Sequence, residues 1–118
     1  MLARANRLTS GEDYRRVVKS GRRAGSRTLV VHVRDDHEPG KDPGPARVGF
    51  IVSKAVGGAV ERNRVRRRLR HLCRTRVGAL PAGLLLVVRA LPESAAATSA
   101  QLDADLGRCL DRLAGVPA

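Results

Sequence analysis

The segment ERNRVRRRLRHLCRTR, residues 61–76, is the longest patterned element of the chain and the point from which its fold can be worked out. Its apolar residues recur at Val65, Leu69, Leu72 and Cys73, a spacing that places them on one face of an α-helix. The segment carries eight arginines and no acidic residue after Glu61. The pattern predicts a helix that packs by its apolar face and presents arginine around the rest of its circumference.

A charge run of this kind most often forms a solvated helix face, but such a face usually mixes both signs. Here Arg66 and Arg70 repel one another at i, i+4, as do Arg70 and Arg74, and no carboxylate within the run relieves the repulsion. The whole chain has a formal net charge of +12. A polyanion-binding surface therefore explains the helix better than a merely solvated one.

No targeting or membrane-spanning segment is evident in the sequence. Residues 1–7 are basic, but the apolar core of a signal peptide does not follow them. No apolar run approaches the roughly 20 residues that span a bilayer. We therefore expect a cytoplasmic protein with no membrane partner, in which residues 1–7 form a flexible basic arm of a single RNA-binding domain spanning residues 1–118.

Residues 11–20 are predicted to form a helix. Thr9 or Ser10 can cap its first turn, and an acidic residue three positions further on completes a capping box. Gly21 is a natural residue for its C-terminal end. The side of this helix away from its apolar stripe is basic.

Two β-branched segments, residues 27–34 and 47–53, predict strands. Residues 35–46 lie between them and contain three prolines and four acidic residues, which predicts a loop. We expect the two strands to pair antiparallel through this loop. Its acids could keep RNA away from that end of the protein, although a solvated hairpin tip is the simpler interpretation.

The remaining elements complete an α+β pattern. The arginine helix is expected to run to about Val77, and residues 84–88 fit a strand buried on both faces. Residues 93–118 predict a C-terminal helix and tail, with Thr98 or Ser99 as the cap. The order α-β-β-α-β-α predicts a single-domain sandwich, with a small mixed sheet covered by helices.

The sequence offers no credible catalytic or metal centre. The histidines lack metal-ligand spacing, and Cys73 and Cys109 fall at apolar helix positions, which favours buried thiols. Gly57 and Gly58 are not followed by the Gly-Lys-Ser/Thr of a nucleotide-binding loop. We therefore assign no catalytic residue, no metal ligand and no small-molecule substrate.

Tyr14 and Phe50 are the only aromatic residues of the chain. Stacking of a base on an aromatic ring contributes roughly 1–3 kcal/mol in single-strand binders. The two rings could flank a shallow groove for unpaired nucleotides. Core packing is the alternative for both, and it is the better interpretation for Phe50.

Several motifs together resemble the bacterial ribonuclease P protein family. RVGFIVSK (residues 47–54) precedes a glycine-containing turn and then RNR (residues 62–64), while residues 7–14 match an N-terminal R-L-x-x-x-x-[D/E]-[F/Y] pattern. The resemblance covers about residues 4–92. It implies a protein subunit that helps a catalytic RNA to remove the 5′ leader of precursor tRNA, with the chemistry in the RNA. It also implies Mg²⁺ held mainly by the RNA subunit and the substrate, a left-handed parallel β-α-β crossover and one further short strand.

The same resemblance implies two binding sites. The residues expected to bind the RNA subunit are Arg62, Asn63, Arg64, Arg66, Arg67 and Arg70. The residues expected in a leader-binding cleft between the first helix and the sheet are Tyr14, Val18, Phe50, Lys54 and Arg89. Val18 stands where the family commonly has a second aromatic, Ala55 replaces a lysine and Gly58 replaces an asparagine. We therefore expect shape and phosphate contacts to carry more of leader binding here.

Two other functions remain open on the sequence alone. The chain could be a ribosomal or general RNA-binding protein with no role in catalysis. It could also be a nuclease by itself, although no residue cluster supports this.

Overall fold

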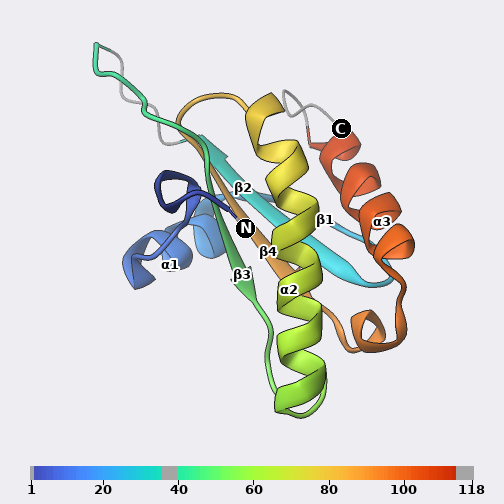
Figure 1. Ribbon diagram of the computed structural model, residues 1–118. Coiled ribbons are helices and arrows are strands. Elements are labelled where there is room, and N and C mark those ends of the chain that lie inside the picture. The colour runs from blue at the N-terminus through green and yellow to red at the C-terminus, as the bar shows by residue number, and fades with distance from the viewer. Residues whose placement is uncertain (1, 36–39, 114–118) are drawn as a thin grey trace.

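The computed structural model describes residues 2–35 and 40–113. In this part of the chain, helices pack on both sides of a four-stranded mixed sheet (Figure 1). The strands are β1 (Arg22–Gly25), β2 (Leu29–Asp35), β3 (Arg47–Ile51) and β4 (Leu84–Ala90). Their order in the sheet is β1-β2-β4-β3, with only β3 and β4 parallel. The predicted α+β class is confirmed, and β1 is the further short strand.

Helices and 3-10 turns precede β1, connect β3 to β4 and follow β4. They are η1 (Arg4–Asn6), α1 (Gly11–Ser20), α2 (Ala59–Arg76), η2 (Val77–Ala79), η3 (Pro92–Ala96) and α3 (Ser99–Arg112). The predicted caps are present: Ser10 Oγ accepts the Asp13 N–H at 3.3 Å, and Thr98 forms a reciprocal capping box with Gln101. Such bonds satisfy amides that a first turn leaves without partners. None of these described helices is long and apolar enough to cross a membrane.

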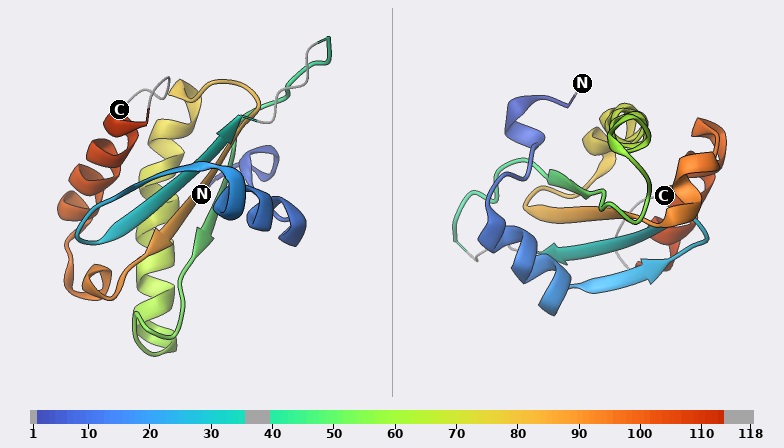
Figure 2. Two further views of the ribbon diagram at one scale, coloured as in Figure 1. Left: turned by 180° about the vertical axis from the view of Figure 1, so that it is seen from behind. Right: turned by 90° about the horizontal axis from the view of Figure 1, so that it is seen from below.

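The sheet lies between α1 on one side and α2 and α3 on the other (Figure 2), and each side carries an apolar cluster. On one face, here called the α2 side, Val65 and Leu69 of α2 pack over the sheet together with the apolar face of α3. On the opposite face, the α1 side, Val17 of α1 packs on Leu85 and Val87. Because side chains alternate along a strand, β4 is buried on both faces, as its continuous apolar run predicts.

The prediction that the strands on either side of residues 35–46 pair with each other is wrong. β2 and β3 run in opposite directions, but β4 lies between them and pairs with both. β4 is the most apolar strand, so the central position buries it most completely. Residues 36–39 of the predicted loop lie outside the described residues.

β3, α2 and β4 form a parallel β-α-β unit. In Figure 1 the chain runs down β3, returns through α2 in front of the sheet and enters β4 to the right of β3. This path is a left-handed crossover, whereas such connections are normally right-handed. It agrees with what the family resemblance implies.

Residues 2–7, which the sequence predicts to be a flexible basic arm, contact the edge of β3 in the structure. Leu2 is buried on the α2 side. Arg7 forms a parallel bridge with Val48, and the Leu8 N–H donates to the Val48 carbonyl at 3.0 Å. Leu8 belongs to the α1-side cluster. The N-terminal segment therefore passes around the outer edge of β3 from one side of the sheet to the other (Figure 2).

Gly21 ends α1, but not in the left-handed conformation expected of a glycine there, because its φ is −81°. A Cβ at this position would collide with the backbone carbonyl oxygens of Val17 and Val33. Glycine is required here by the close approach of α1 to β2.

Candidate nucleic-acid interface

The arginines of α2 divide into two flanks. The anchored flank consists of Arg64, Arg68 and Arg76 and faces η3 and α3. Arg64 and Arg68 donate to main-chain carbonyls of η3 and of the residue that follows it, at 3.4 Å and 2.8 Å. Arg76 binds the Asp103 carboxylate through Nε and Nη2, at 3.1 Å and 3.0 Å. These arginines hold the C-terminal part of the chain onto α2.

The open flank consists of Asn63, Arg66, Arg67, Arg70 and Arg74. These side chains are exposed or half-buried. In residues 2–35 and 40–113, no hydrogen bond or ion pair engages any of the four guanidinium groups. The like charges are thus left available to a phosphate-bearing partner. Sequence reasoning could not separate the two flanks, because the separation depends on where η3 and α3 pack.

Arg62 lies in the first turn of α2 and is half-buried. Its Nε is enclosed and has no hydrogen-bond partner among the described residues. Buried polar atoms are nearly always paired. Arg62 therefore has unused hydrogen-bonding capacity at the same end of α2 as Asn63.

A pocket of about 230 Å³ lies at the outer edge of β3, between the N-terminal segment and α2. We call it the edge pocket. Its lining residues are Leu2, Arg7, Leu8, Thr9, Tyr14, Val48, Phe50 and Arg70. Both aromatic residues of the chain therefore meet an open-flank arginine in one place, which the sequence did not predict.

Tyr14 is fixed in this pocket by β3. Its phenolic oxygen accepts the backbone N–H of Phe50 at 3.1 Å. The ring occupies the space that a side chain at residue 49 would fill, because a Cβ on Gly49 would collide with it. The Tyr14 ring therefore explains why the RVG motif has glycine at position 49.

The residues expected in one leader cleft do not share one surface. Arg89 follows Leu85 and Val87 at alternate positions, so it lies on the α1 side, whereas Phe50 packs with the α2-side cluster. Val18 of α1 is 37% exposed, and Lys54 is exposed just beyond the end of β3. We call Val18 and Arg89 the α1-side surface; Tyr14 packs with the α1-side cluster but, like Phe50, lines the edge pocket.

His32 is a residue of the α1 side that sequence reasoning missed. It is only 2% exposed, and neither ring nitrogen has a partner among the described residues. It pairs across strands with Val87 and Arg23. Burial lowers the pKa of His32 below its usual range, and the positive charges of Arg89 and Arg23 lower it further. The imidazole is therefore neutral near pH 7.

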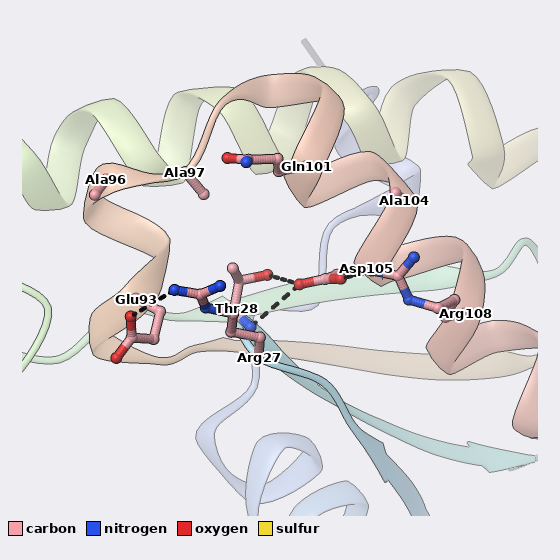
Figure 3. A pocket seen from close by; sticks show the side chains of 9 residues that line it. All are labelled: Arg27, Thr28, Glu93, Ala96, Ala97, Gln101, Ala104, Asp105 and Arg108. Carbon is pink, nitrogen blue, oxygen red and sulfur yellow. Dashed lines mark hydrogen bonds and ion pairs between the residues drawn. The ribbon is translucent and has the colours of Figure 1, made fainter.

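A larger pocket of about 490 Å³ lies between η3, α3 and the start of β2 (Figure 3). Its two arginines each have a carboxylate partner, Arg27 with Glu93 at 4.0 Å and Arg108 with Asp105. Thr28 donates to Asp105 from its hydroxyl at 2.5 Å and from its N–H at 3.2 Å. Because these charges balance, the pocket has no excess charge to attract a polyanion.

Asp105 is buried and ties α3 to β2. Burial alone would raise its pKa, but the hydrogen bonds from Thr28 and Arg108 and the charge of Arg108 outweigh burial and hold the pKa below its usual range. Burial likewise raises the pKa of Cys73 to about 12 and also raises the pKa of Cys109. Both cysteines are buried thiols, as predicted.

The family model of ribonuclease P matches residues 2–114. The ribonuclease P protein component of Streptomyces avermitilis is 56% identical, over 98% of this chain and 97% of the relative. The corresponding protein of a Nocardioides species is 53% identical, over 96% of this chain and 95% of the relative.

Solved structures agree. The ribonuclease P protein of Staphylococcus aureus superposes with a TM-score of 0.81 at 27% identity, covering 98% of this chain and 100% of that chain. The protein of Thermotoga maritima superposes with a TM-score of 0.75 at 26% identity, covering 92% of this chain and 98% of that chain. This chain therefore belongs to the ribonuclease P protein family and is a protein subunit of that ribonucleoprotein endonuclease.

Proposed function

We propose that this chain binds the catalytic RNA of ribonuclease P through the open flank of α2 and binds the 5′ leader of precursor tRNA at a separate surface. The observation that carries the proposal is the set of open-flank arginines. They have no internal partner in the described part of the chain, in a protein whose net charge is +12. Arginine forks suit phosphate oxygens and unstacked bases.

The roles within the RNR motif differ. Arg64 donates to a carbonyl of η3, so its first role is to hold that turn. Arg62 and Asn63 have no such bond among the described residues and are free to contact RNA. We therefore assign RNA-subunit binding to Arg62 and the open flank, and a supporting role to Arg64.

The leader is proposed to lie on the α1-side surface. Arg89 and Lys54 sit near the C-terminal ends of the two parallel strands, where they can contact leader phosphates. Val18 supplies an exposed apolar contact in place of an aromatic ring. A surface of this composition recognises backbone and shape more than base identity.

The chemistry is proposed to reside in the RNA. Within residues 2–35 and 40–113, no three His, Cys, Asp or Glu side chains gather into a possible metal site. Mg²⁺ is proposed to be held mainly by the RNA subunit and the substrate, where it would activate the attacking water. The chain's own residues would position the leader and neutralise RNA phosphates. A cytoplasmic location follows from the same role.

A reconstitution assay tests the proposal. The purified chain, the ribonuclease P RNA and precursor tRNA are mixed in all combinations at low and high Mg²⁺. Stimulation of the RNA by the chain at low Mg²⁺ is the expected result. Cleavage by the chain alone would make it a nuclease, and equal binding of unrelated structured RNAs without stimulation would make it a general RNA-binding protein.

A further inference from the structure

The edge pocket joins residues that the family resemblance distributes between two partners. Tyr14 and Phe50 are expected to contact the leader, and Arg70 is expected to contact the RNA subunit. The structure places all three around one pocket. It also adds residues of the N-terminal segment, including Leu2 and Arg7, to which no function was assigned.

The polar groups of the pocket are mostly hydrogen-bond donors. Arg7 Nε donates to the Leu2 carbonyl at 3.1 Å, which fixes the side chain and leaves its terminal nitrogens without a partner among the described residues. Arg70 has no partner there either. Tyr14 accepts a bond from Phe50, but its own hydroxyl proton has no acceptor in that part of the chain. Among the described residues, no carboxylate lines the pocket.

The rest of the lining is apolar, and the pocket itself is small. Phe50, Val48, Leu2 and Leu8 provide the apolar walls. The volume of about 230 Å³ lies below the roughly 300–1,000 Å³ of sites that enclose whole drug-sized ligands. A pocket of this size, with the Phe50 ring and the two cations Arg7 and Arg70 in its lining, suits a single planar base and its phosphate.

We propose that the edge pocket binds one unstacked nucleotide of an RNA strand. The base lies against Phe50, the Tyr14 hydroxyl donates to it, and its phosphate lies between Arg7 and Arg70. The proposal rests on the proposed function, because it needs an RNA partner. The nucleotide can come from the precursor leader or from an unpaired position of the RNA subunit, since both offer the same chemistry.

The position of the pocket gives this nucleotide a linking role. The N-terminal segment crosses the outer edge of β3 from the α2 side to the α1 side (Figure 2). The pocket lies at that crossing, and its lining includes Arg70 of the open flank of α2 and Tyr14 of α1. A strand bound there would connect the two surfaces that the proposed function keeps apart.

The test uses the reconstituted RNA–protein complex and three variants, Phe50→Leu, Arg7→Gln and Arg70→Gln. Arg22→Gln is the matched control, because Arg22 is exposed on β1 at the opposite edge of the sheet and lines no part of the pocket. Affinity is measured for precursor tRNA, for mature tRNA without a leader, and for the chain with the RNA subunit alone. Thermal unfolding of each variant checks that it folds.

Phe50→Leu is expected to weaken either precursor tRNA binding or binding to the RNA subunit roughly 5- to 150-fold, the range of one base–aromatic stack. Each arginine variant is expected to lower the salt slope of the same interaction by about 0.7. A loss confined to precursor tRNA identifies a leader nucleotide, and a loss in assembly identifies a nucleotide of the RNA subunit.

The nucleotide site is overturned if all three folded variants match Arg22→Gln while the unsubstituted chain still stimulates the RNA; the proposed function then stands. Losses in the arginine variants without a loss in Phe50→Leu would also overturn it, by leaving a phosphate contact and no base site. Failure of the unsubstituted chain to stimulate the RNA is a different result, which removes the proposed function itself.

Discussion

The phenolic oxygen of Tyr14 accepts the backbone N–H of Phe50 at 3.1 Å, across the position of Gly49. β3 is the outermost strand, so this amide has no neighbouring strand to bond. Tyr14 thereby links α1 to the sheet and blocks part of the exposed edge of β3. Its structural and RNA-binding roles must therefore be separated by experiment.

Tyr14→Phe removes the hydroxyl and keeps the ring. The Phe50 amide loses its partner, and we expect the free energy of unfolding to fall by about 0.5–1.5 kcal/mol. Tyr14→Ala also removes the ring from the edge pocket and, where that pocket holds a leader nucleotide, should cost leader-bearing substrate about 1–3 kcal/mol of binding free energy. Chemical denaturation and binding of precursor and mature tRNA measure the two effects. An equal loss of affinity for both tRNAs would assign Tyr14 to the fold alone.

Gly21→Ala should destabilise the protein by about 1–3 kcal/mol, because the new methyl group overlaps two backbone carbonyls that cannot move independently. Gly25→Ala is the control: its Cβ would lie 4.0 Å from Val30 Cγ2, an ordinary contact. Thermal unfolding of both variants compares them. Equal melting temperatures would show that α1 can shift away from β2 at little cost.

Arg68→Met keeps the aliphatic stem of an anchored-flank residue and removes its bond to the carbonyl before α3. We expect a loss of about 1–2 kcal/mol in the free energy of unfolding, since a charged donor to a partly buried carbonyl is removed. Arg67→Gln, on the open flank, should leave unfolding within about 0.5 kcal/mol of the unsubstituted chain. Denaturant titrations measure the free energy of unfolding of both variants. A larger loss in Arg67→Gln than in Arg68→Met would contradict the division into flanks.

His32 should make stability depend on pH. Its folded-state pKa lies below the ordinary value of 6.5, so the unfolded chain binds a proton more readily than the folded chain. The free energy of unfolding should therefore fall as pH decreases through 6.5 and level off below the folded-state pKa. His32→Phe should remove this slope, whereas exposed His71→Gln should keep it. Measurement of the unfolding free energy between pH 8 and pH 5 tests this prediction. An unchanged slope in His32→Phe would show that groups other than His32 cause the pH dependence.

The elements could be predicted from sequence where the pattern was local. Residues 11–20 and the caps at Ser10 and Thr98 follow from rules that act within one helical turn. The buried strand β4 follows from its unbroken apolar run. Strand pairing did not follow, because adjacency in sequence favoured β2 beside β3, while burial placed β4 between them.

The candidate site was predicted in composition but not in arrangement. Arginine content and spacing identify α2, but only the packing of η3 and α3 shows that Arg64 and Arg68 are occupied. The sequence indicates that the two aromatic residues could flank a groove, but their position beside Arg7 depends on how the N-terminal segment packs. His32 gave no pattern in the sequence, because its position is defined by strands on either side of it.

The open flank of α2 is proposed to bind the catalytic RNA. The most direct measurement is the salt dependence of binding between the chain and the ribonuclease P RNA, for the unsubstituted protein and for Arg66→Gln with Arg67→Gln. For the double variant we expect weaker binding and a plot of log affinity against log salt that is shallower by about 0.7–0.9 per lost phosphate contact. An unchanged affinity and slope in the folded double variant would contradict it.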